Sequence, residues 1–299
     1  SRPIRSIRRG LALVCGLLVQ TVTQASWASV PETRFLAKAG GHIAYDDSGG
    51  TGPLIVAIPG MGDLRAQYRL LRPRLVEAGY RVVTLDVRGQ GESSASWPDY
   101  SARAVGSDAL ALIHHLGVGQ AVLLGNSFAA GAALWAARTE PGTVRGIGML
   151  GPILRDRPSS LLTRAALGIG FAGPWRNGFW MTYWDSLFPL CKPADHADYR
   201  ARLAANLREP GRMAALQTLI GLSKVETEAL VGKVAVPALV VMGSRDPDFA
   251  DPIAEATWLA TRMKARVSVI DGAGHYPHVE SPGQVADEIQ RFIDRLKAG

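Results

Sequence analysis

Short apolar runs alternate with helical apolar spacing along most of the chain, beginning at about residue 33. Residues 54–58 form a continuous apolar run between two prolines, as in a strand that is buried on both faces. We predict further strands at 81–85, 121–124, 144–150, 238–242 and 267–270. Helical spacing predicts helices at 65–78, 101–116, 127–138, 252–263 and 283–297. Strands that alternate with crossover helices predict an α/β fold with a mostly parallel central sheet and helices on both faces.

The alternation is preceded by a hairpin and broken by a long interruption. Two short strands are predicted at 35–39 and 42–46, joined by a pair of glycines. Residues 153–225 contain no convincing strand, and residues 171–184 are rich in aromatic side chains. Because strands resume afterwards, we interpret this block as a helical lid inserted over one end of the sheet. The predicted parts are a signal segment, the core in two pieces and the lid: 1–28, 29–151 with 226–299, and 152–225.

The first 28 residues have the pattern of an export signal. Four arginines in the first ten residues precede the apolar run 11–19, and Ser26-Trp27-Ala28 has small residues at the two positions that a signal peptidase recognises. That run is too short to span a bilayer, which takes about 20 residues. We therefore expect a protein that is periplasmic or secreted, with no stable membrane span once the signal is removed. The alternatives are an uncleaved membrane anchor or a helix packed on the domain.

Charge and cysteine content narrow the range of partners. The formal net charge is +7, but four of the excess positive charges lie in the first ten residues. The rest of the chain has no basic stripe, so we expect no nucleic-acid partner. Cys15 lies in the predicted signal, which leaves only Cys191 in the mature protein and excludes an internal disulfide.

The segment Gly125-Asn126-Ser127-Phe128-Ala129 stands between a predicted buried strand and a helix. A sharp strand-to-helix turn needs very small residues on both sides of its apex, because its backbone is strained and the helix packs close. Gly125 and Ala129 meet this need, although the usual pattern has glycine at the second position. The alternative is that Ser127 caps the helix. The strand–turn–helix setting favours Ser127 as a catalytic nucleophile.

His275 is the candidate base. It follows a predicted strand in a loop that contains glycine and leads to the last helix. A loop at the carboxyl end of a strand can bring a base to a serine from a distant part of the chain. His278 is the rival, and its alternative roles are a loop hydrogen bond or a surface position. His114 and His115 fall within a predicted helix, and we assign them structural roles.

Asp246 is the candidate acid, three residues after Gly243 at the end of a predicted strand. A carboxylate there would hold the imidazole in the required tautomer and stabilise the imidazolium that forms. Asp248 and Asp251 compete, but Pro252 suits the first turn of a helix, so we expect them to cap that helix. The order serine, acid, histidine along the chain is typical of α/β-hydrolases.

The glycine-containing segment after the first buried strand is the candidate oxyanion loop. A tetrahedral intermediate needs two donors directed at its oxyanion. We predict that the backbone N–H groups of Met61 and Phe128 supply them. Gly60 and Gly62 would let the backbone approach the substrate, although a simple turn would use the same residues.

With these motifs the chain resembles the α/β-hydrolase family, in its lid-bearing single-domain branch. The run Asp86-Val-Arg-Gly-Gln-Gly-Glu-Ser resembles that family's structural turn after the fourth strand, and His275-Tyr-Pro with Glu280 and Pro282 resembles its histidine loop. One departure is Pro59-Gly60, where many members have His-Gly. The resemblance runs from about residue 33 to 297 and is weakest across the lid. It implies the α/β-hydrolase fold and a covalent acyl-enzyme that needs no metal or organic cofactor.

Serine at position 127 argues against dehalogenase or epoxide hydrolase chemistry, for which the related fold uses an aspartate. The aromatic residues of the lid offer an apolar pocket, and packing of the lid on the core is their other role. The candidate substrate contacts are Trp175, Trp180 and Trp184. We therefore expect a carboxylic-ester hydrolase for a small to medium apolar molecule, with neutral esters cleaved faster than charged ones.

Two other functions stay open at this point. Hydrolysis of a carbon–carbon bond next to a ketone, or perhydrolysis, uses the same three residues, and Asn126 beside the serine occurs in carbon–carbon hydrolases of this fold. The other alternative is a catalytically silent binding protein. Such proteins typically lose a member of the triad, whereas all three candidates are present here.

Overall fold

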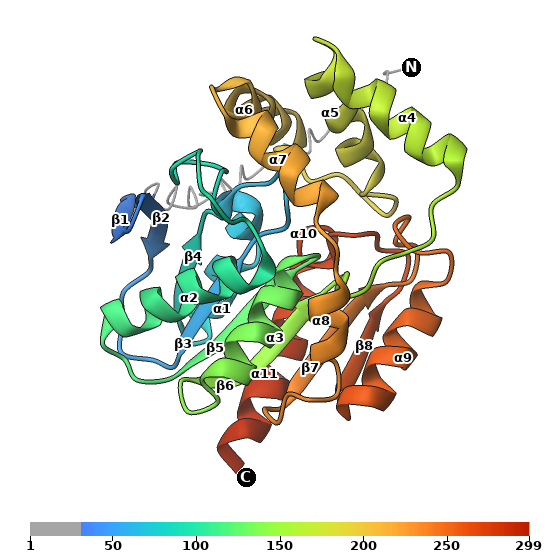
Figure 1. Ribbon diagram of the computed structural model, residues 1–299. Helices are drawn as coiled ribbons and strands as arrows, with labels where there is room; N and C mark the ends of the chain where they lie inside the picture. The colour runs from blue at the N-terminus through green and yellow to red at the C-terminus, as the bar shows by residue number, and fades with distance from the viewer. Residues whose placement is uncertain (1–30, 299) are drawn as a thin grey trace, which may run out of the picture. The chain divides into compact units, whose positions relative to one another are not determined.

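The computed structural model describes residues 31–298, so the predicted signal segment lies outside the described residues. An eight-stranded sheet in the order β1-β2-β4-β3-β5-β6-β7-β8 forms the centre (Figure 1). The strands are β1 (Arg34–Lys38), β2 (Gly41–Asp47), β3 (Leu54–Ile58), β4 (Arg81–Leu85), β5 (Ala121–Asn126), β6 (Val144–Leu150), β7 (Ala238–Gly243) and β8 (Arg266–Ile270). β1 and β2 pair antiparallel, and β3 to β8 pair in parallel. The predicted mostly parallel sheet is confirmed.

Helices cover both faces of this sheet. They are α1 (Arg72–Glu77), α2 (Ala102–Leu116), α3 (Ala129–Thr139), α8 (Val225–Leu230), α9 (Pro252–Met263) and α11 (Pro282–Ala298). Because successive strand residues point to opposite sides, the sheet has two apolar cores. In β3, Leu54, Val56 and Ile58 belong to the core with α2 and α3, whereas Ile55 and Ala57 belong to the core with α1 and α11. This explains why the whole strand is apolar.

The described chain between β6 and β7 is helical. It contains α4 (Leu161–Ala172), α5 (Arg176–Ser186), α6 (His196–Arg208) and α7 (Arg212–Gly221), followed by α8. We call α4 to α7 the inserted helices; they lie together at one end of the sheet (Figure 1). Side chains of α5, α6 and α7 share a third apolar cluster with Leu64 and Tyr276 of the core. Among residues 31–298, no helix combines the length and the apolar character that a membrane crossing requires.

Three elements differ from the prediction. The helix expected at 65–78 is divided into a short 3₁₀ helix, η1 (Arg65–Arg69), and α1. Pro73 lies in the first turn of α1, where its missing N–H costs nothing, so it favours a new helix start rather than a continuous helix. α8 continues to Leu230, beyond the predicted end of the helical block. The four-residue α10 (Pro277–Glu280) is too short to show a periodic pattern.

Candidate active site

The candidate residues meet at the carboxyl edge of the sheet. The parallel ladders pair Ile58 with Gly125 and Gly243 with Ile270, so the loops that follow β3, β5, β7 and β8 leave the same edge. In open α/β sheets this edge is where ligands bind. Ser127 and His275, with the oxyanion candidate Met61, line one cavity there.

Ser127 lies at the apex of a strained turn. Its φ of 57° is in the left-handed region, which is unusual for a residue other than glycine. The turn is held because the Ser127 N–H donates to Leu150 O at 3.0 Å. A side chain at Gly125 would lie 2.4 Å from Ala129 O, so only glycine lets α3 begin this close to β5. The methyl group of Ala129 itself is fully buried without conflict.

His275 and Asp246 form a buried hydrogen-bonded pair. His275 Nδ1 lies 2.8 Å from Asp246 Oδ2, and since a carboxylate only accepts, the Nδ1–H donates. The two residues are 3% and 1% exposed. Within residues 31–298 the Ser127 hydroxyl has no hydrogen-bond partner, and catalytic contacts of this kind often tighten only when substrate binds. Because Nδ1 is engaged in this hydrogen bond, Nε2 is the imidazole nitrogen left for chemistry at the cavity.

Two carboxylates face the same nitrogen. Asp248 Oδ2 lies 3.4 Å from His275 Nδ1, and the Asp248 Oδ1 accepts the hydroxyl of Tyr183 at 2.6 Å. Burial opposes a positive charge on His275, but Asp246 and Asp248 outweigh it and raise its pKa to about 9. The imidazolium that a general base becomes is therefore stabilised.

The expectation that Asp248 caps the following helix was wrong, whereas the one for Asp251 is confirmed. Asp251 Oδ1 accepts the N–H of Ala254 at the start of α9. Asp248 is turned back instead, because its own N–H donates to Asp246 Oδ1 at 2.9 Å. This local turn directs the Asp248 carboxylate at the cavity.

The two candidate oxyanion donors border Ser127. Neither the Met61 N–H nor the Phe128 N–H has an acceptor within the described residues. A side chain at Gly60 would lie 3.4 Å from Ser127 Cβ, so the backbone before Met61 passes directly beside the serine. Two free N–H groups beside a serine are what a tetrahedral oxyanion requires.

A buried polar network supports the serine turn from below. Asn126 Nδ2 donates to Leu150 O at 2.8 Å and to His275 O at 3.3 Å, while its Oδ1 accepts from Gln67. Gln67 Oε1 bonds His278 Nε2 at 3.1 Å. Burial, with the charge of His275, lowers the pKa of His278 to about 3, so it stays neutral. His278 therefore makes the buried hydrogen bond expected of a structural residue, not a surface residue.

Glu280 ties the histidine loop to the inserted segment. Its Oε2 accepts the N–H of Gly274 at 2.5 Å, and its Oε1 accepts the N–H groups of Leu190 and Cys191. Burial raises the pKa of this carboxyl, although the three N–H donors oppose that rise. The loop that carries His275 is thus anchored to the connection between α5 and α6.

The cavity at Ser127 has a volume of about 360 Å³ and is lined mainly by apolar side chains. This is within the usual range of small-molecule sites. Of the three predicted tryptophans, only Trp180 lines it. Trp184, one turn further along α5, is 1% exposed and donates to Asp63, and Trp175 is 56% exposed before α5 begins. The aromatic and aliphatic residues that line the cavity with Trp180 include Leu167, Phe171, Phe179, Tyr183 and Leu187.

Polar residues of the cavity that the sequence did not point to include Arg157, Thr163 and Lys224. Tyr183, one of the aromatic residues of the inserted block, also lines it. The spacing of Tyr183 three residues after Trp180 would have placed both on one face of α5. No sequence signal marks Arg157 or Lys224, which come from irregular segments before α4 and α8.

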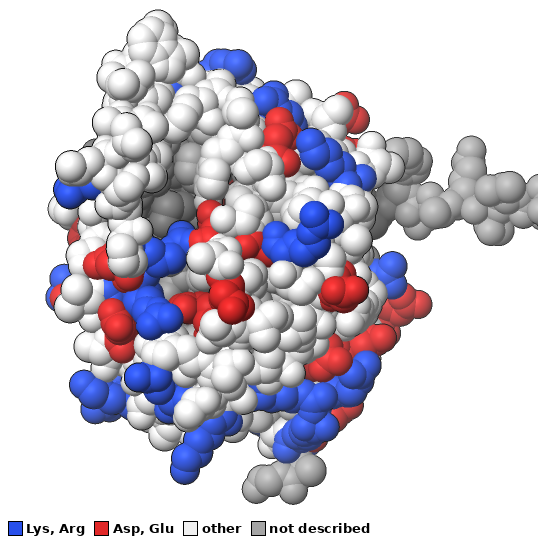
Figure 2. All heavy atoms as spheres, turned by 90° about the vertical axis from the view of Figure 1, so that its right-hand side faces the viewer, with Lys and Arg blue, Asp and Glu red and all other residues white. Residues whose placement is uncertain are grey.

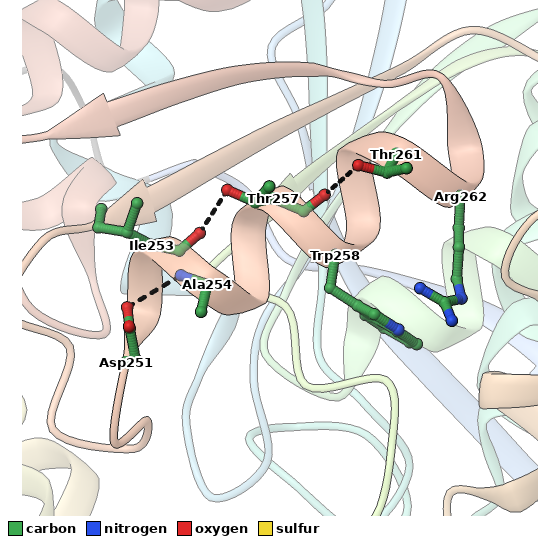
Figure 3. A pocket seen from close by; sticks show the side chains of 7 residues that line it. All are labelled: Asp251, Ile253, Ala254, Thr257, Trp258, Thr261 and Arg262. Carbon is green, nitrogen blue, oxygen red and sulfur yellow. Dashed lines mark hydrogen bonds between the residues drawn. The ribbon is translucent and has the colours of Figure 1, made fainter.

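A second hollow, of about 510 Å³, lies along α9 (Figure 3). All seven of its lining residues come from this helix and its N-terminal cap. Thr257 and Thr261 donate to carbonyl groups one turn back, and Asp251 caps the helix, so these polar groups are already paired. The hollow is an open helix surface, and volume alone does not identify a site.

Asp246, Asp248 and His275 also present one ligand atom each, all within 4.8 Å of one another. A metal at this position would need an unprotonated Nδ1, whereas the bond to Asp246 needs Nδ1–H. The observed hydrogen bond and a metal there exclude one another.

Known proteins share much of this pattern. The sequence profile of the Alpha/beta hydrolase family matches residues 55–288. The chain is 22% identical over 228 residues to 3-oxoadipate enol-lactonase 2 of Acinetobacter baylyi, which covers 73% of this chain and 80% of that protein. It is 32% identical over 128 residues to bifunctional epoxide hydrolase 2 of Sus scrofa, but this covers only 23% of that protein's length and 42% of this chain.

The fold is shared with solved structures as well. A thermophilic esterase from Thermogutta terrifontis has a TM-score of 0.73 and 23% identity, covering 89% of this chain and 99% of that chain. The fold predicted from the sequence motifs is thereby confirmed.

Proposed function

This chain belongs to the alpha/beta hydrolase family, and on that premise we propose that it hydrolyses carboxylic esters through an acyl-enzyme on Ser127. The observation that carries the proposal is the buried bond of 2.8 Å between His275 and Asp246, beside a serine that is held on a strained turn. The similarity to an enol-lactonase, named for opening a cyclic ester, supports the same class of bond.

In the first half of the reaction, Ser127 Oγ attacks the ester carbonyl carbon while His275 Nε2 takes the hydroxyl proton. The carbonyl oxygen becomes an oxyanion that the N–H groups of Met61 and Phe128 bind. The carbon–oxygen bond to the alcohol then breaks, and His275 returns the proton to the departing oxygen. This leaves the acyl group on Ser127.

In the second half, water replaces the alcohol. His275 takes a proton from the water as its oxygen attacks the acyl carbon, and the same two N–H groups hold the new oxyanion. Collapse breaks the bond to Ser127, which regains its proton from His275. Asp246 keeps the imidazole oriented throughout and balances its transient positive charge.

A panel of p-nitrophenyl esters tests the proposal. Wild type is expected to release p-nitrophenol with a saturable rate. Ser127→Ala and His275→Ala are each expected to lower kcat by about a thousandfold or more. A fluorophosphonate probe should label wild type and not Ser127→Ala. A folded wild type that neither turns over esters nor takes the label would favour the catalytically silent binding protein.

No side-chain contact singles out carbon–carbon cleavage within the described residues. Asn126, the residue that kept this alternative open, uses its side chain on Gln67, Leu150 and the His275 carbonyl. These hydrogen bonds explain why asparagine stands at this position of the turn, and Asn126 is not among the residues that line the cavity.

We also propose that the protein is exported, on the signal pattern of residues 1–28. Expression in a bacterial host with a secretion pathway, followed by N-terminal sequencing, is expected to give a mature chain that starts at Ser29. An uncleaved chain that still carries the arginines of its first ten residues, and that is found in the membrane fraction, would instead show that the segment is a membrane anchor.

A further inference from the structure

Two cations line the cavity that holds Ser127. Arg157 lies between β6 and α4, and Lys224 directly precedes α8. They belong to segments 67 residues apart, so the fold and not local sequence brings them to one cavity. Figure 2 shows the face that carries α4: its upper left is largely uncharged, and charged side chains of both signs are spread over the rest of the face.

Neither cation has an anionic partner in the described part of the chain. Within residues 31–298, no carboxylate oxygen lies within 4.0 Å of Arg157 or of the Lys224 ammonium. Lys224 Nζ reaches only the Leu222 carbonyl, at 3.5 Å, and the Arg157 guanidinium lies 5.1 Å from the Phe249 ring centre. Arg155, two residues before Arg157, is in contrast paired with Glu255.

The nearby carboxylates are already engaged. Asp248 is the acid that lines the cavity, and it faces His275 and Tyr183. Asp156 accepts from the Ser223 hydroxyl and the Lys224 backbone N–H, not from the ammonium. Burial and the charge of Arg157 lower the pKa of Lys224, while Asp156 opposes this. Lys224 is half-buried and Arg157 is exposed, and these two like charges border one cavity, an arrangement that an added anion would relieve.

We propose that Arg157 and Lys224 bind a carboxylate carried by the substrate, so that the preferred esters are monoanions with an apolar middle section. This rests on the proposed ester hydrolysis and specifies its substrate class. Arginine and lysine bind carboxylates through charge-assisted hydrogen bonds, and an apolar cavity strengthens such bonds. The cavity, of about 360 Å³, leaves room for a short chain between the reacting carbonyl and that charge. This substrate class is the opposite of the sequence-based expectation that neutral esters are cleaved faster, because neither Arg157 nor Lys224 is marked by a sequence pattern.

The kinetic test uses two esters that differ in one group. p-Nitrophenyl hydrogen adipate carries a carboxylate where p-nitrophenyl hexanoate ends in a methyl group. We expect wild type to have about tenfold higher kcat/KM for the adipate after correction for spontaneous hydrolysis. Arg157→Gln and Lys224→Gln should each lower this adipate-to-hexanoate ratio about tenfold, the loss typical of one charge-assisted hydrogen bond.

Arg164→Gln is the matched control. Arg164 is on α4, next to the cavity-lining Thr163, but does not line the cavity. Its substitution removes one positive charge from the same region and should leave the ratio unchanged. A wild-type ratio of one or less, or a ratio that falls equally in all three variants, would overturn the proposal.

A binding test separates this inference from the proposed reaction. Ser127→Ala is titrated calorimetrically with monomethyl adipate and with dimethyl adipate. Tighter binding of the monoanion, lost when Arg157→Gln is added, supports the carboxylate site even if wild type hydrolyses neither nitrophenyl ester. If ester hydrolysis depends on Ser127 but both adipates bind equally, the proposed ester hydrolysis stands and the proposed carboxylate site is rejected.

Discussion

The carboxyl edge of the sheet and the inserted helices contribute to the cavity in different ways. At the edge, Ser127, Asp246 and His275 are at most 5% exposed and are held by buried hydrogen bonds. On the inserted helices, Leu161 and Leu162 of α4 are more than 80% exposed. Reacting groups need fixed geometry, since small displacements lower rates greatly, whereas a substrate wall can vary. We infer that the edge determines the reaction and the inserted helices determine the substrate.

The same contrast exists within α5. Trp184 points to the core, where Asp63 accepts from its indole and from the Tyr199 hydroxyl. Trp180 and Tyr183 line the cavity instead. Gly62 has a φ of 69°, and a side chain there would lie 2.5 Å from the Trp180 ring, so the oxyanion loop packs directly on this helix. Helix α5 therefore both attaches to the core through Trp184 and lines the cavity through Trp180 and Tyr183.

The strongest test of this contrast compares two acids of one loop. Asp246→Asn is expected to lower kcat for p-nitrophenyl hexanoate by about a thousandfold to ten-thousandfold, because the amide fails to hold the Nδ1–H tautomer. Asp248→Asn should lower it by less than about tenfold, since its oxygen is 3.4 Å from Nδ1 and makes no hydrogen bond to it. The reverse order of the two losses would assign Asp248 as the acid.

The pH dependence of the reaction tests the charge at the edge. His275 acts as a base only when neutral, so kcat/KM should rise about tenfold per pH unit well below the pKa of about 9, or roughly fiftyfold from pH 7 to 9. Asp248→Asn removes one carboxylate that raises this pKa and should move the limb to lower pH. If the rising limb of the pH profile stays at the same pH in this variant, Asp248 does not contribute to the pKa of His275.

The same pKa has a consequence for folding. Because the folded pKa lies above the unfolded value of 6.5, protonated His275 stabilises the folded state fully below pH 6.5. That contribution is lost as pH rises through about 9. Thermal unfolding of wild type and His275→Gln between about pH 6 and 10 should therefore converge toward the alkaline end.

Two tyrosines on the inserted helices separate anchoring from recognition. Tyr199→Phe removes a donor from the buried Asp63 carboxylate and should lower the free energy of unfolding by about 1–3 kcal/mol in a urea titration. Tyr183→Phe removes the donor to Asp248 at the cavity, and with Tyr183 37% exposed it should change stability by only about 0.5 kcal/mol. Equal losses would mean that the hydrogen bond of Tyr183 on α5 stabilises the fold as much as that of Tyr199 on α6.

The smallest expected effect compares two leucines of α4. Leu167 lines the cavity, whereas Leu162 is 83% exposed and does not. Leu167→Ala should raise KM for p-nitrophenyl hexanoate about three- to tenfold through lost apolar contact. Leu162→Ala is the matched control and should leave KM unchanged. If both raise KM alike, the substrate contacts more of α4 than the cavity does.

Local patterns were enough to predict the sheet and to select candidate reacting groups that the fold brings to one edge. β3 is apolar throughout because it is buried on both faces. The residues around Ser127 are small because the turn is strained. Both constraints restrict residue types directly and are therefore visible in the sequence. The 3₁₀ break before Pro73 and the turned Asp248 were missed, since each depends on one hydrogen bond or one proline and leaves no repeat in the sequence.

What the sequence by itself determined is therefore the alternation of strands and helices and the order of serine, acid and histidine. Tertiary structure decided which face of α5 meets the cavity, and that Trp180 rather than Trp175 or Trp184 lines it. It also decided that Arg157 and Lys224 share that cavity. The physical reason is that periodicity reports whether a side chain is buried, whereas contacts between distant segments depend on how the helices pack on the sheet.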